Sequence, residues 1–313
     1  MPFRLLLVLP LLAGLFAVAA GCDTDDGEDA DLPDRPGLAV AESDAGVATS
    51  FGRLTDALDA APPVSIVARV DHAANAASAG LDLRPTRVVL FGNPALGTPL
   101  MQVNQQAGLD LPQKVLVFED AEGQTVVGYN TTDYLAQRHG VGGAETLGRI
   151  AGALATFAGV AAGDSTVNVE VGGGPVSRDE GVVTATSAND VGATYAGLVS
   201  AIESNPNLTV MAELDHAANA ASVGLELRPT RLVVFGNPAL GTPLMQDEQT
   251  VGIDLPQKML VYEDAAGRVV VAYNDPGYLA ERHDLDDSDE VIDRVRGALR
   301  ALAAAAVSGD TND

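Results

Sequence analysis

The chain has 313 residues, a length that predicts about two domains. Apolar residues make up 47% of it and aromatic residues only 4%, with no Trp, so Leu, Val and Ala must supply most of the buried surface. Its 43 Asp and Glu against 18 Lys and Arg leave a net charge of −25, which repels polyphosphate and argues against nucleic-acid binding.

Residues 1–21 have the pattern of a lipoprotein signal peptide. A basic residue, Arg4, precedes an apolar run that is short for a membrane span. Cys22, the only cysteine, directly follows Ala-Ala-Gly, the spacing of a bacterial lipobox in which the Cys is diacylated and becomes the mature N-terminus. We therefore expect a protein of the bacterial cell envelope, anchored to the membrane through lipidated Cys22 on the periplasmic or extracytoplasmic face. An ordinary signal peptide with an incidental Cys is the alternative.

An acidic tether is expected next, at residues 22–37. From Asp23 to Pro36, seven of fourteen residues are acidic and almost none is apolar. Such a stretch repels itself and stays extended, so it is expected to hold the folded part away from the membrane.

The remainder of the chain is an internal repeat. Twelve residues from Phe91 to Gln102 recur unchanged from Phe235 to Gln246, 144 residues later. Extending the match in both directions predicts a first module at 38–162, a Gly-rich linker at 163–181, a second module at 182–307 and a short tail at 308–313.

Hydrophobic periodicity predicts the same elements in each module. Phe51, Leu54 and Leu58 fall at helical spacing, and Gly123 lies in the turn of a hairpin. Each module therefore reads as a two-layer α+β fold, a mostly antiparallel sheet with helices on one face. In the first module we expect strands at 39–42, 64–70, 87–91, 114–119 and 125–129, and helices around 51–58, 73–79, 98–108, 134–139 and 145–162.

The repeated segment is expected to form a strand-to-helix turn. Gly92 permits an unusual backbone angle, and Asn93-Pro94 disfavours immediate entry into a helix. Thr98 followed by Pro99 has the pattern of an N-cap and a first helical residue, so the helix is expected to begin there and to end at Gly108.

The two copies have drifted unequally. From Asp71 to His139, 50 of 69 positions are identical between them, whereas from Ala39 to Ala68 only 7 of 30 are. Core packing with partial gene conversion explains part of this difference. The matched set nevertheless includes many polar residues, which indicates either a functional surface or buried hydrogen bonding. In the first copy these are Asp71, His72, Asn75, Arg84, Arg87, Asn93, Gln102, Gln113, Lys114, Asn130, Arg138 and His139.

These motifs resemble the domain of unknown function 302 family. The resemblance rests on Asp-His-Ala-Ala-Asn-Ala, on Arg-Pro-Thr-Arg followed by Phe-Gly-Asn-Pro-x-Leu-Gly-Thr-Pro-Leu-Met-Gln, on Asp-Leu-Pro-Gln-Lys, and on Tyr-Asn with Tyr-Leu-Ala-x-Arg-His. Both modules match, so it covers about four-fifths of the chain. The resemblance implies a small α+β fold that tends to dimerise, and hence two modules that pair within one chain as a pseudo-dimer. It implies no established reaction.

The four histidines form two pairs of equivalents, His72 with His216 and His139 with His283. Imidazole is a common metal ligand and general base, so two His and one Asp per module would make a metal or haem site if the fold brought them together. No pair has the spacing that places ligands on one helical face, and we assign no metal ligands. At a helix C-terminus, His139 and His283 are also explained as caps.

Basic residues are scarce here, so those kept in both copies are candidates for holding a small anionic ligand beside the repeated turn. Pairing with the surplus of surface carboxylates is the alternative. No catalytic residue and no cofactor is identified. The candidate ligand-binding residues are Asp71, His72, Arg84, Asn93, Lys114, Arg138 and His139 of the first module, and Asp215, His216, Arg228, Asn237, Lys258, Arg282 and His283 of the second.

The sequence thus predicts a non-catalytic module that binds a small molecule or an envelope protein, at the module interface or beside the repeated turn. A redox accessory protein that uses the paired His with a metal or haem is the alternative. A third interpretation is a purely structural spacer.

Overall fold

The computed structural model describes residues 35–164 and 169–308, all of which fall in one compact unit, Pro33–Asp313. The predicted signal peptide, Cys22, most of the tether and all but the first residue of the predicted tail lie outside the described residues. Within the described ranges, no helix combines the length and hydropathy that a membrane crossing needs.

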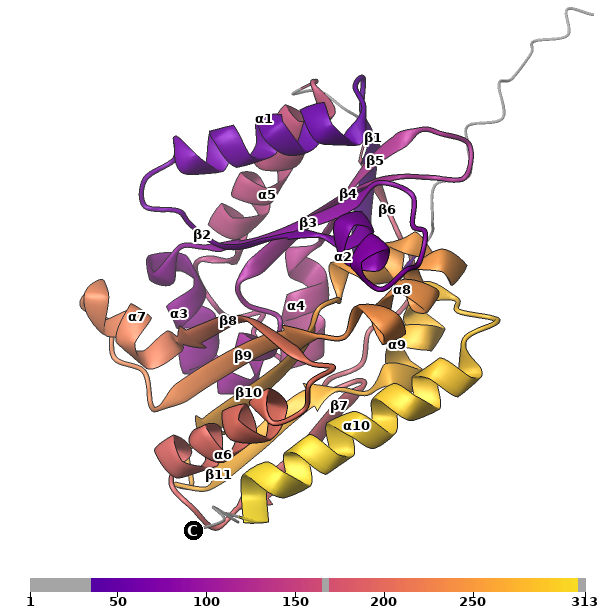
Figure 1. Ribbon diagram of the computed structural model, residues 1–313. Coiled ribbons are helices and arrows are strands. Elements are labelled where there is room, and N and C mark those ends of the chain that lie inside the picture. The colour runs from indigo at the N-terminus through magenta and orange to yellow at the C-terminus, as the bar shows by residue number, and fades with distance from the viewer. Residues whose placement is uncertain (1–34, 165–168, 309–313) are drawn as a thin grey trace, which may run out of the picture. The chain divides into compact units, whose positions relative to one another are not determined.

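Apart from the helix after the repeated turn, the first module folds into the elements that the sequence predicts, with small shifts at their ends. Each of its strands and long helices has an equivalent in the second module (Figure 1). Its elements are β1 (Leu38–Glu42), α1 (Val47–Asp59), β2 (Ser65–Asp71), α2 (His72–Ser78), β3 (Thr86–Gly92), α3 (Pro94–Val103), the 3₁₀ helix η1 (Gln105–Leu109), β4 (Gln113–Glu119), β5 (Thr125–Asn130), α4 (Thr132–His139) and α5 (Leu147–Ala162).

A two-residue strand in the linker, β6 (Glu170–Val171), pairs with β1 before the second module begins. The second module then repeats the order. Its elements are β7 (Val182–Ser187), α6 (Val191–Glu203), β8 (Thr209–Asp215), α7 (His216–Ser222), β9 (Thr230–Gly236), α8 (Pro238–Asp247), η2 (Gln249–Ile253), β10 (Gln257–Glu263), β11 (Val269–Asn274), α9 (Pro276–His283) and α10 (Asp289–Ser308).

Each module has one antiparallel sheet. The strand order is β2-β3-β4-β5-β1-β6 in the first module and β8-β9-β10-β11-β7 in the second, so the central strands are equivalent. The register is also repeated: Asp71 lies opposite Arg87, and Asp215 lies opposite Arg231. The predicted α+β class and antiparallel sheet are confirmed.

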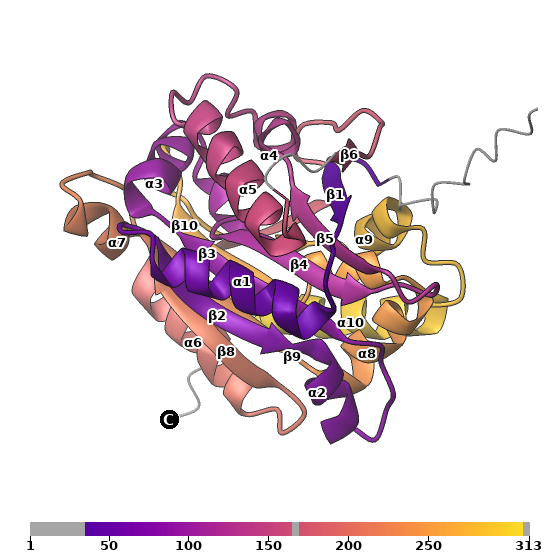
Figure 2. The same cartoon turned by 90° about the horizontal axis from the view of Figure 1, so that it is seen from above.

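Long helices cover the outer face of each sheet. Helices α1 and α5 lie side by side over the first sheet, and α6 and α10 over the second (Figures 1 and 2). Leu54, Leu58 and Leu154 are fully buried against strand residues such as Val89 and Val115, as the helical spacing predicts. The outer layer therefore supplies an ordinary apolar core.

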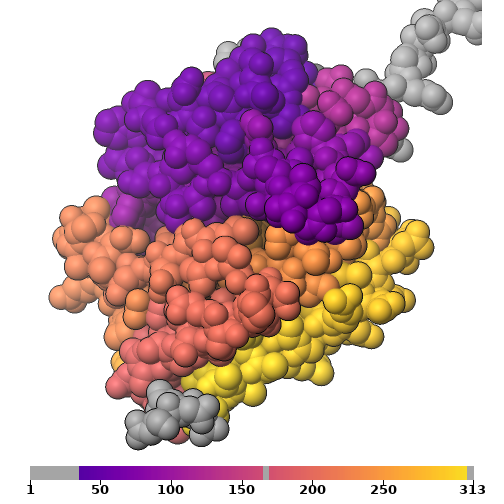
Figure 3. Space-filling view, viewed as in Figure 1, coloured from indigo at the N-terminus to yellow at the C-terminus, as the bar shows by residue number. Residues whose placement is uncertain are grey.

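The inner faces of the two sheets are turned toward the other module. Gly108 of η1 lies close to the side chain of Leu260 on β10, and Gly252 of η2 lies close to that of Leu116 on β4, so each 3₁₀ segment packs on the partner sheet. The two halves meet along one continuous boundary, indigo and magenta against orange and yellow (Figure 3). The predicted intramolecular pseudo-dimer is confirmed.

The prediction for the helix after the repeated turn was wrong at both ends, because α3 stops at Val103 and Gly108 lies in the separate 3₁₀ helix η1. Helix α3 begins at Pro94, with the Asn93 side chain accepting a hydrogen bond from the Ala95 amide at 3.0 Å, and Pro99 lies inside the helix. Asn93 is extended, the conformation that a residue before Pro favours, and Pro94 suits a first helical position. The same reversal occurs at Asn237 and Pro238.

Candidate functional site

A buried cluster of charges joins the two modules at the centre of their interface. We call it the ionic core, and its members come in equivalent pairs from both halves. They are Asp110, Lys114, Asn130, Tyr134, Arg138 and His139 with Asp254, Lys258, Asn274, Tyr278, Arg282 and His283.

Each Asp of the ionic core is hydrogen-bonded to an Arg and a His side chain. Arg138 Nη1 lies 2.6 Å from Asp110 Oδ2, and His139 Nε2 lies 2.8 Å from the same oxygen. Arg282 and His283 approach Asp254 Oδ2 in the same way, at 2.6 and 3.0 Å. The two predicted Arg-His pairs therefore ligate a carboxylate instead of capping the ends of their helices.

Other contacts of the ionic core cross between the modules. Lys114 Nζ donates to Asp254 Oδ1 at 3.1 Å, and the tyrosine hydroxyls Tyr134 and Tyr278 lie 3.1 Å apart. Each Arg also donates across the interface to an Asn amide oxygen, Arg138 to Asn274 at 2.9 Å and Arg282 to Asn130 at 2.7 Å. Every such bond would be lost if the modules separated.

The charges of the ionic core depend on one another. Burial alone would raise the pKa of the Asp110 carboxyl, but Arg138, His139 and Lys114 together hold that pKa well below its usual range. Burial lowers the pKa of the Lys258 ammonium to about 7, and the neighbouring Lys114 charge acts in the same direction. These buried charges are tolerated because they are paired and hydrogen-bonded.

One part of the ionic core has the composition of a catalytic triad. Thr250 Oγ1 lies 3.0 Å from His283 Nδ1, and His283 Nε2 lies 3.0 Å from Asp254. Thr250 and His283 are both fully buried, and neither lines the clefts described below. A hydroxyl that no substrate reaches cannot act as a nucleophile, so we assign this relay to the packing of the interface.

Arg84 and Arg228 also join the modules. Arg84 Nε donates to Gln249 Oε1 at 2.7 Å, and Arg228 Nε donates to Gln105 Oε1 at 2.8 Å. Together with Lys114 and Lys258 they hold the interface, and none of the four lines either cleft. The basic residues that the sequence placed beside the repeated turn therefore do not converge there.

Two clefts flank the interface, one beside each copy of the repeated turn. The first, which we call the open cleft, has a volume of about 420 Å³ and lies between the turn and α3 of the first module and the end of β8 with α7 of the second. Helices α3 and α7 lie side by side in both views (Figures 1 and 2). Its apolar lining includes Val67, Phe91, Met101, Ile150, Leu154 and Phe157.

Three polar atoms in the lining of the open cleft are buried without a hydrogen-bond partner. They are His216 Nε2, Thr98 Oγ1 and Gln113 Nε2. Their side chains are at least nine-tenths buried, with His216 only 5% exposed. Unpartnered buried polar atoms are uncommon and costly, so three of them around a cavity of this size indicate a ligand. The closed cleft, described below, has two equivalent atoms, His72 Nε2 and Thr242 Oγ1, in a far smaller space.

His216 is neutral and presents a bare ring nitrogen. Burial lowers its pKa to about 4, although a hydrogen bond to the backbone of Gly108 and the charge of Asp215 both act to raise it. Because Nε2 has no partner, the contact with Gly108 falls to Nδ1. Nε2 is then left as a hydrogen-bond acceptor in the cleft wall.

The equivalent cavity of the second module, the closed cleft, has a volume of only about 70 Å³. Leu208 and Met211 stand in it where the open cleft has Val64 and Val67. The methyl carbon of Met211 packs against Gly236 and would lie 3.5 Å from a Cβ atom placed on that glycine. Residues of α10 in the closed cleft are no larger than their counterparts on α5, so the larger strand residues account for the closure.

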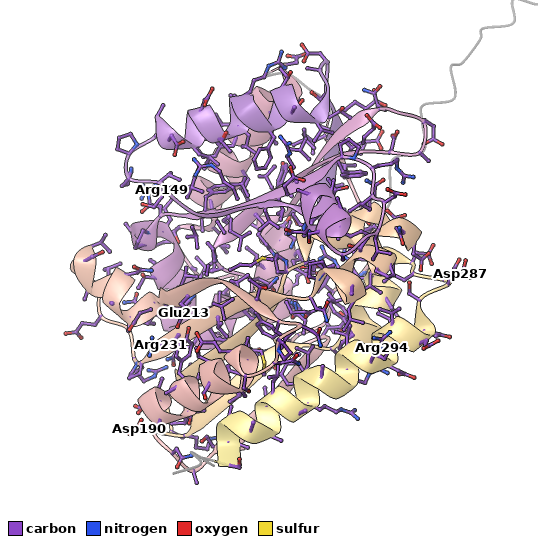
Figure 4. All side chains as sticks on the ribbon, viewed as in Figure 1. Arg149, Asp190, Glu213, Arg231, Asp287 and Arg294 are labelled. Atoms are coloured by element: carbon purple, nitrogen blue, oxygen red, sulfur yellow. The ribbon has the colours of Figure 1, made fainter. Side chains whose placement is uncertain are left out.

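The clefts also differ in charge. Glu213 and Asp215 line the open cleft, which has no Lys or Arg in its lining, whereas the closed cleft is lined by no carboxylate. Asp71, the equivalent of Asp215, accepts from Arg87 at 2.9 Å and stands outside the closed cleft. Figure 4 shows Glu213 on β8 with Arg231 nearby on β9.

The structure thus divides the predicted site residues between two places. Five of them line the clefts: His72, His216, Asp215, Asn93 and Asn237. Both Asn side chains also cap helices. The interface takes the rest except Asp71. His72 and His216 line the clefts, whereas His139 and His283 each contact an Asp of the ionic core. Among the described residues, no group of three or more His, Cys, Asp or Glu side chains is placed to hold a metal ion.

Sequence reasoning missed several residues of both places. Asp110 and Asp254, on which the ionic core is centred, are identical between the copies, and that identity was an available signal. Val67, Met211 and Glu213 lie in or beside the divergent part of the repeat, where matching positions cannot reveal them.

Comparison with known proteins gives a family and no activity for this chain. The family described as "Domain of unknown function DUF302" matches residues 40–157 and 183–302. A solved structure described as an uncharacterized conserved protein DUF302 from Bacillus stearothermophilus is 17% identical with a TM-score of 0.37, covering 41% of this chain and 98% of that one.

Curated relatives match part of the chain. A protein named Fluoride-specific ion channel FluC 1 from Brucella suis biovar 1 (strain 1330) is 39% identical over 148 residues, covering 47% of this chain and 58% of that protein. A protein of the same name from Brucella abortus biovar 1 (strain 9-941) is also 39% identical over 148 residues, covering 54% of its own length. The chain therefore spans a little over half the length of the curated relatives it matches.

Proposed function

The chain belongs to the DUF302 family in both of its halves, and from that premise we propose that it is a non-catalytic module that binds one small apolar molecule in the open cleft. The observation that carries the proposal is a cavity of about 420 Å³ whose apolar wall holds three unpartnered buried polar atoms. Ligand sites are typically apolar cavities of this size with a few polar groups that orient the ligand.

The contacts of the cleft support binding over catalysis. Among the hydrogen bonds of the described residues, none joins His216 to a Ser, Thr or Cys side chain, so no nucleophile is paired with a base there. The relay that does pair them, Thr250 with His283, is buried in the ionic core. A ligand that occupied the cleft would instead satisfy His216, Thr98 and Gln113 by hydrogen bonding.

We further propose that the module is held at the bacterial envelope by lipidation of Cys22. The lipobox spacing and the acidic residues that follow support this location. Metabolic labelling with a fatty acid tests it: the chain is expected to take up label, and a Cys22→Ser chain is expected to take up none. Equal labelling of both chains would contradict the anchor.

Tryptophol, a neutral indole alcohol, is a suitable probe of the open cleft. The chain has no Trp, so fluorescence excited beyond the Tyr absorption comes from the indole alone. Binding into an apolar cavity is expected to change the intensity and to saturate. The alcohol supplies one donor for His216 Nε2, and it accepts from Gln113.

The repeat supplies the matched control. A Val67→Met chain carries in the open cleft the residue that the closed cleft already has as Met211. The equivalent position of the same fold tolerates Met, so the variant is expected to fold and to bind tryptophol at least about tenfold more weakly. Binding that is unchanged in the folded variant would place the probe elsewhere and overturn the proposal.

A further inference from the structure

We infer that the natural ligand of the open cleft is a small apolar amine, which binds as its ammonium cation. The inference rests on the proposed function and adds the charge of the ligand. It is carried by Glu213, Asp215 and His216, which lie close together in the sequence and all line the cleft.

The acidic side of the open cleft comes from one short segment. Glu213 and Asp215 are two residues apart on β8, so their side chains leave the same face of the strand. His216 follows as the first residue of α7. Two carboxylates and a bare imidazole nitrogen are all hydrogen-bond acceptors, and an ammonium group is all donor.

The buried imidazole is what distinguishes this arrangement from an ordinary acidic surface. His216 Nε2 is held against the cavity without a partner, in a side chain that is 5% exposed. A neutral imidazole accepts from an ammonium group, whereas it repels a carboxylate, since both would be acceptors at that nitrogen. An anionic ligand is therefore disfavoured both by charge and by hydrogen bonding.

The first module shows how the equivalent carboxylate is otherwise used. In the first module Arg87 donates to Asp71 at 2.9 Å, but Arg231 lies over the Tyr195 ring, 3.8 Å from its centroid. Among ion pairs within the described ranges, none joins Arg231 to Asp215. With Arg231 included, the charges of Glu213, Asp215 and Arg231 still sum to −1.

The whole chain adds to this preference. Its net charge of −25 attracts cations over long range and raises their association rate. The apolar wall, with Phe91, Phe157 and Met101, suits an aromatic or aliphatic body attached to the amine. The structure therefore assigns the ligand class as an amphipathic amine and not a simple metal cation.

Three indoles with different head groups test the inference on the full chain. Tryptamine carries an ammonium group, tryptophol a hydroxyl and indole-3-acetate a carboxylate. We expect tryptamine to bind about tenfold more tightly than tryptophol, and indole-3-acetate to bind most weakly. Added salt is expected to weaken the binding of tryptamine and to leave the binding of tryptophol unchanged, because only tryptamine is held by charge.

A double variant, Glu213→Gln with Asp215→Asn, removes both charges and keeps the shape. Asn caps a helix as well as Asp does, so the bond from the Ala218 amide and the start of α7 should survive. The variant is expected to lose the preference for tryptamine and to keep its affinity for tryptophol. Asp71→Asn, the equivalent change outside the clefts, is expected to alter neither the preference for tryptamine nor the affinity for tryptophol.

The outcomes separate the two proposals. If tryptophol and tryptamine bind equally in the wild-type chain, or if the double variant keeps the preference, the amine inference is overturned and the binding site stands. If tryptophol also fails to bind, the proposed function itself falls. Tighter binding of indole-3-acetate would overturn the inference in favour of an anionic ligand.

Discussion

The ionic core and the two clefts lie at the same interface, yet the two copies resemble each other far more closely in the ionic core. Asp110 and Asp254 collect the same types of partner at nearly the same distances, from Arg138 and His139 in one half and from Arg282 and His283 in the other. The clefts, by contrast, differ in volume from about 420 to about 70 Å³. Duplication has kept one region and changed the other.

The difference follows from what each region requires. Hydrogen bonds of the ionic core join the two modules, as Lys114 with Asp254 and Arg138 with Asn274 do, so a change in either copy leaves a buried charge without a partner. The two clefts share no lining residue, so one cleft can close without any effect on the other. We conclude that the ionic core holds the two modules together, and we propose that the open cleft carries the function.

The largest expected effect is on the ionic core. Asp254→Asn leaves Lys114, Arg282 and His283 without their carboxylate and should destabilise the chain by about 3–5 kcal/mol in chemical denaturation. Asp59→Asn removes an exposed ion pair with Arg69 and should cost under about 1 kcal/mol. Equal effects from the two would show that the buried cluster contributes no more than a surface pair.

The second effect depends on pH and on His72 and His216. Burial lowers both pKa values from 6.5 to about 4, so an unfolded chain takes up these protons near pH 6.5 and the folded chain only near pH 4. Stability is therefore lost as pH falls through this window, by roughly 3 kcal/mol per histidine. Chemical denaturation at several pH values measures this. A double His→Gln chain should show a flatter profile, and an identical slope would contradict the burial of the neutral rings.

The smallest effect compares equivalent hydroxyls. Thr98 Oγ1 in the open cleft and Thr242 Oγ1 in the closed cleft are both buried without a partner. Replacing either by Val, which has nearly the same shape, should stabilise the ligand-free chain by about 1 kcal/mol. Only Thr98→Val should weaken the binding of tryptophol. If Thr242→Val weakened it equally, the clefts would not differ as we describe.

The architecture was largely predictable from the sequence, because hydrophobic periodicity predicts the elements and the internal repeat predicts the two modules. The spacing of Phe51, Leu54 and Leu58 predicted a buried helix face, and the repeat predicted two like modules. The start of α3 was mispredicted because Thr98-Pro99 and Asn93-Pro94 carry the same capping pattern, and local sequence does not decide between them.

The candidate site was predictable only in part. Comparing the copies found His216, Asp215 and Asn93, since these residues match their counterparts. It also selected Lys114 and Arg138, which serve the interface, because identity between copies marks packing as well as function. The difference between the clefts lies in mismatches such as Val67 with Met211, whose effect appears only when the cavities are compared.

The stoichiometry of tryptamine binding, measured by isothermal titration calorimetry, tests the asymmetry of the clefts most directly. The wild-type chain should bind one molecule in the open cleft, and a Val67→Met chain should bind none there. A chain with Leu208→Val and Met211→Val should gain a second, weaker site, because the reopened cleft lacks the carboxylates. Two equal sites in the wild-type chain, or one site that survives Val67→Met, would contradict the account.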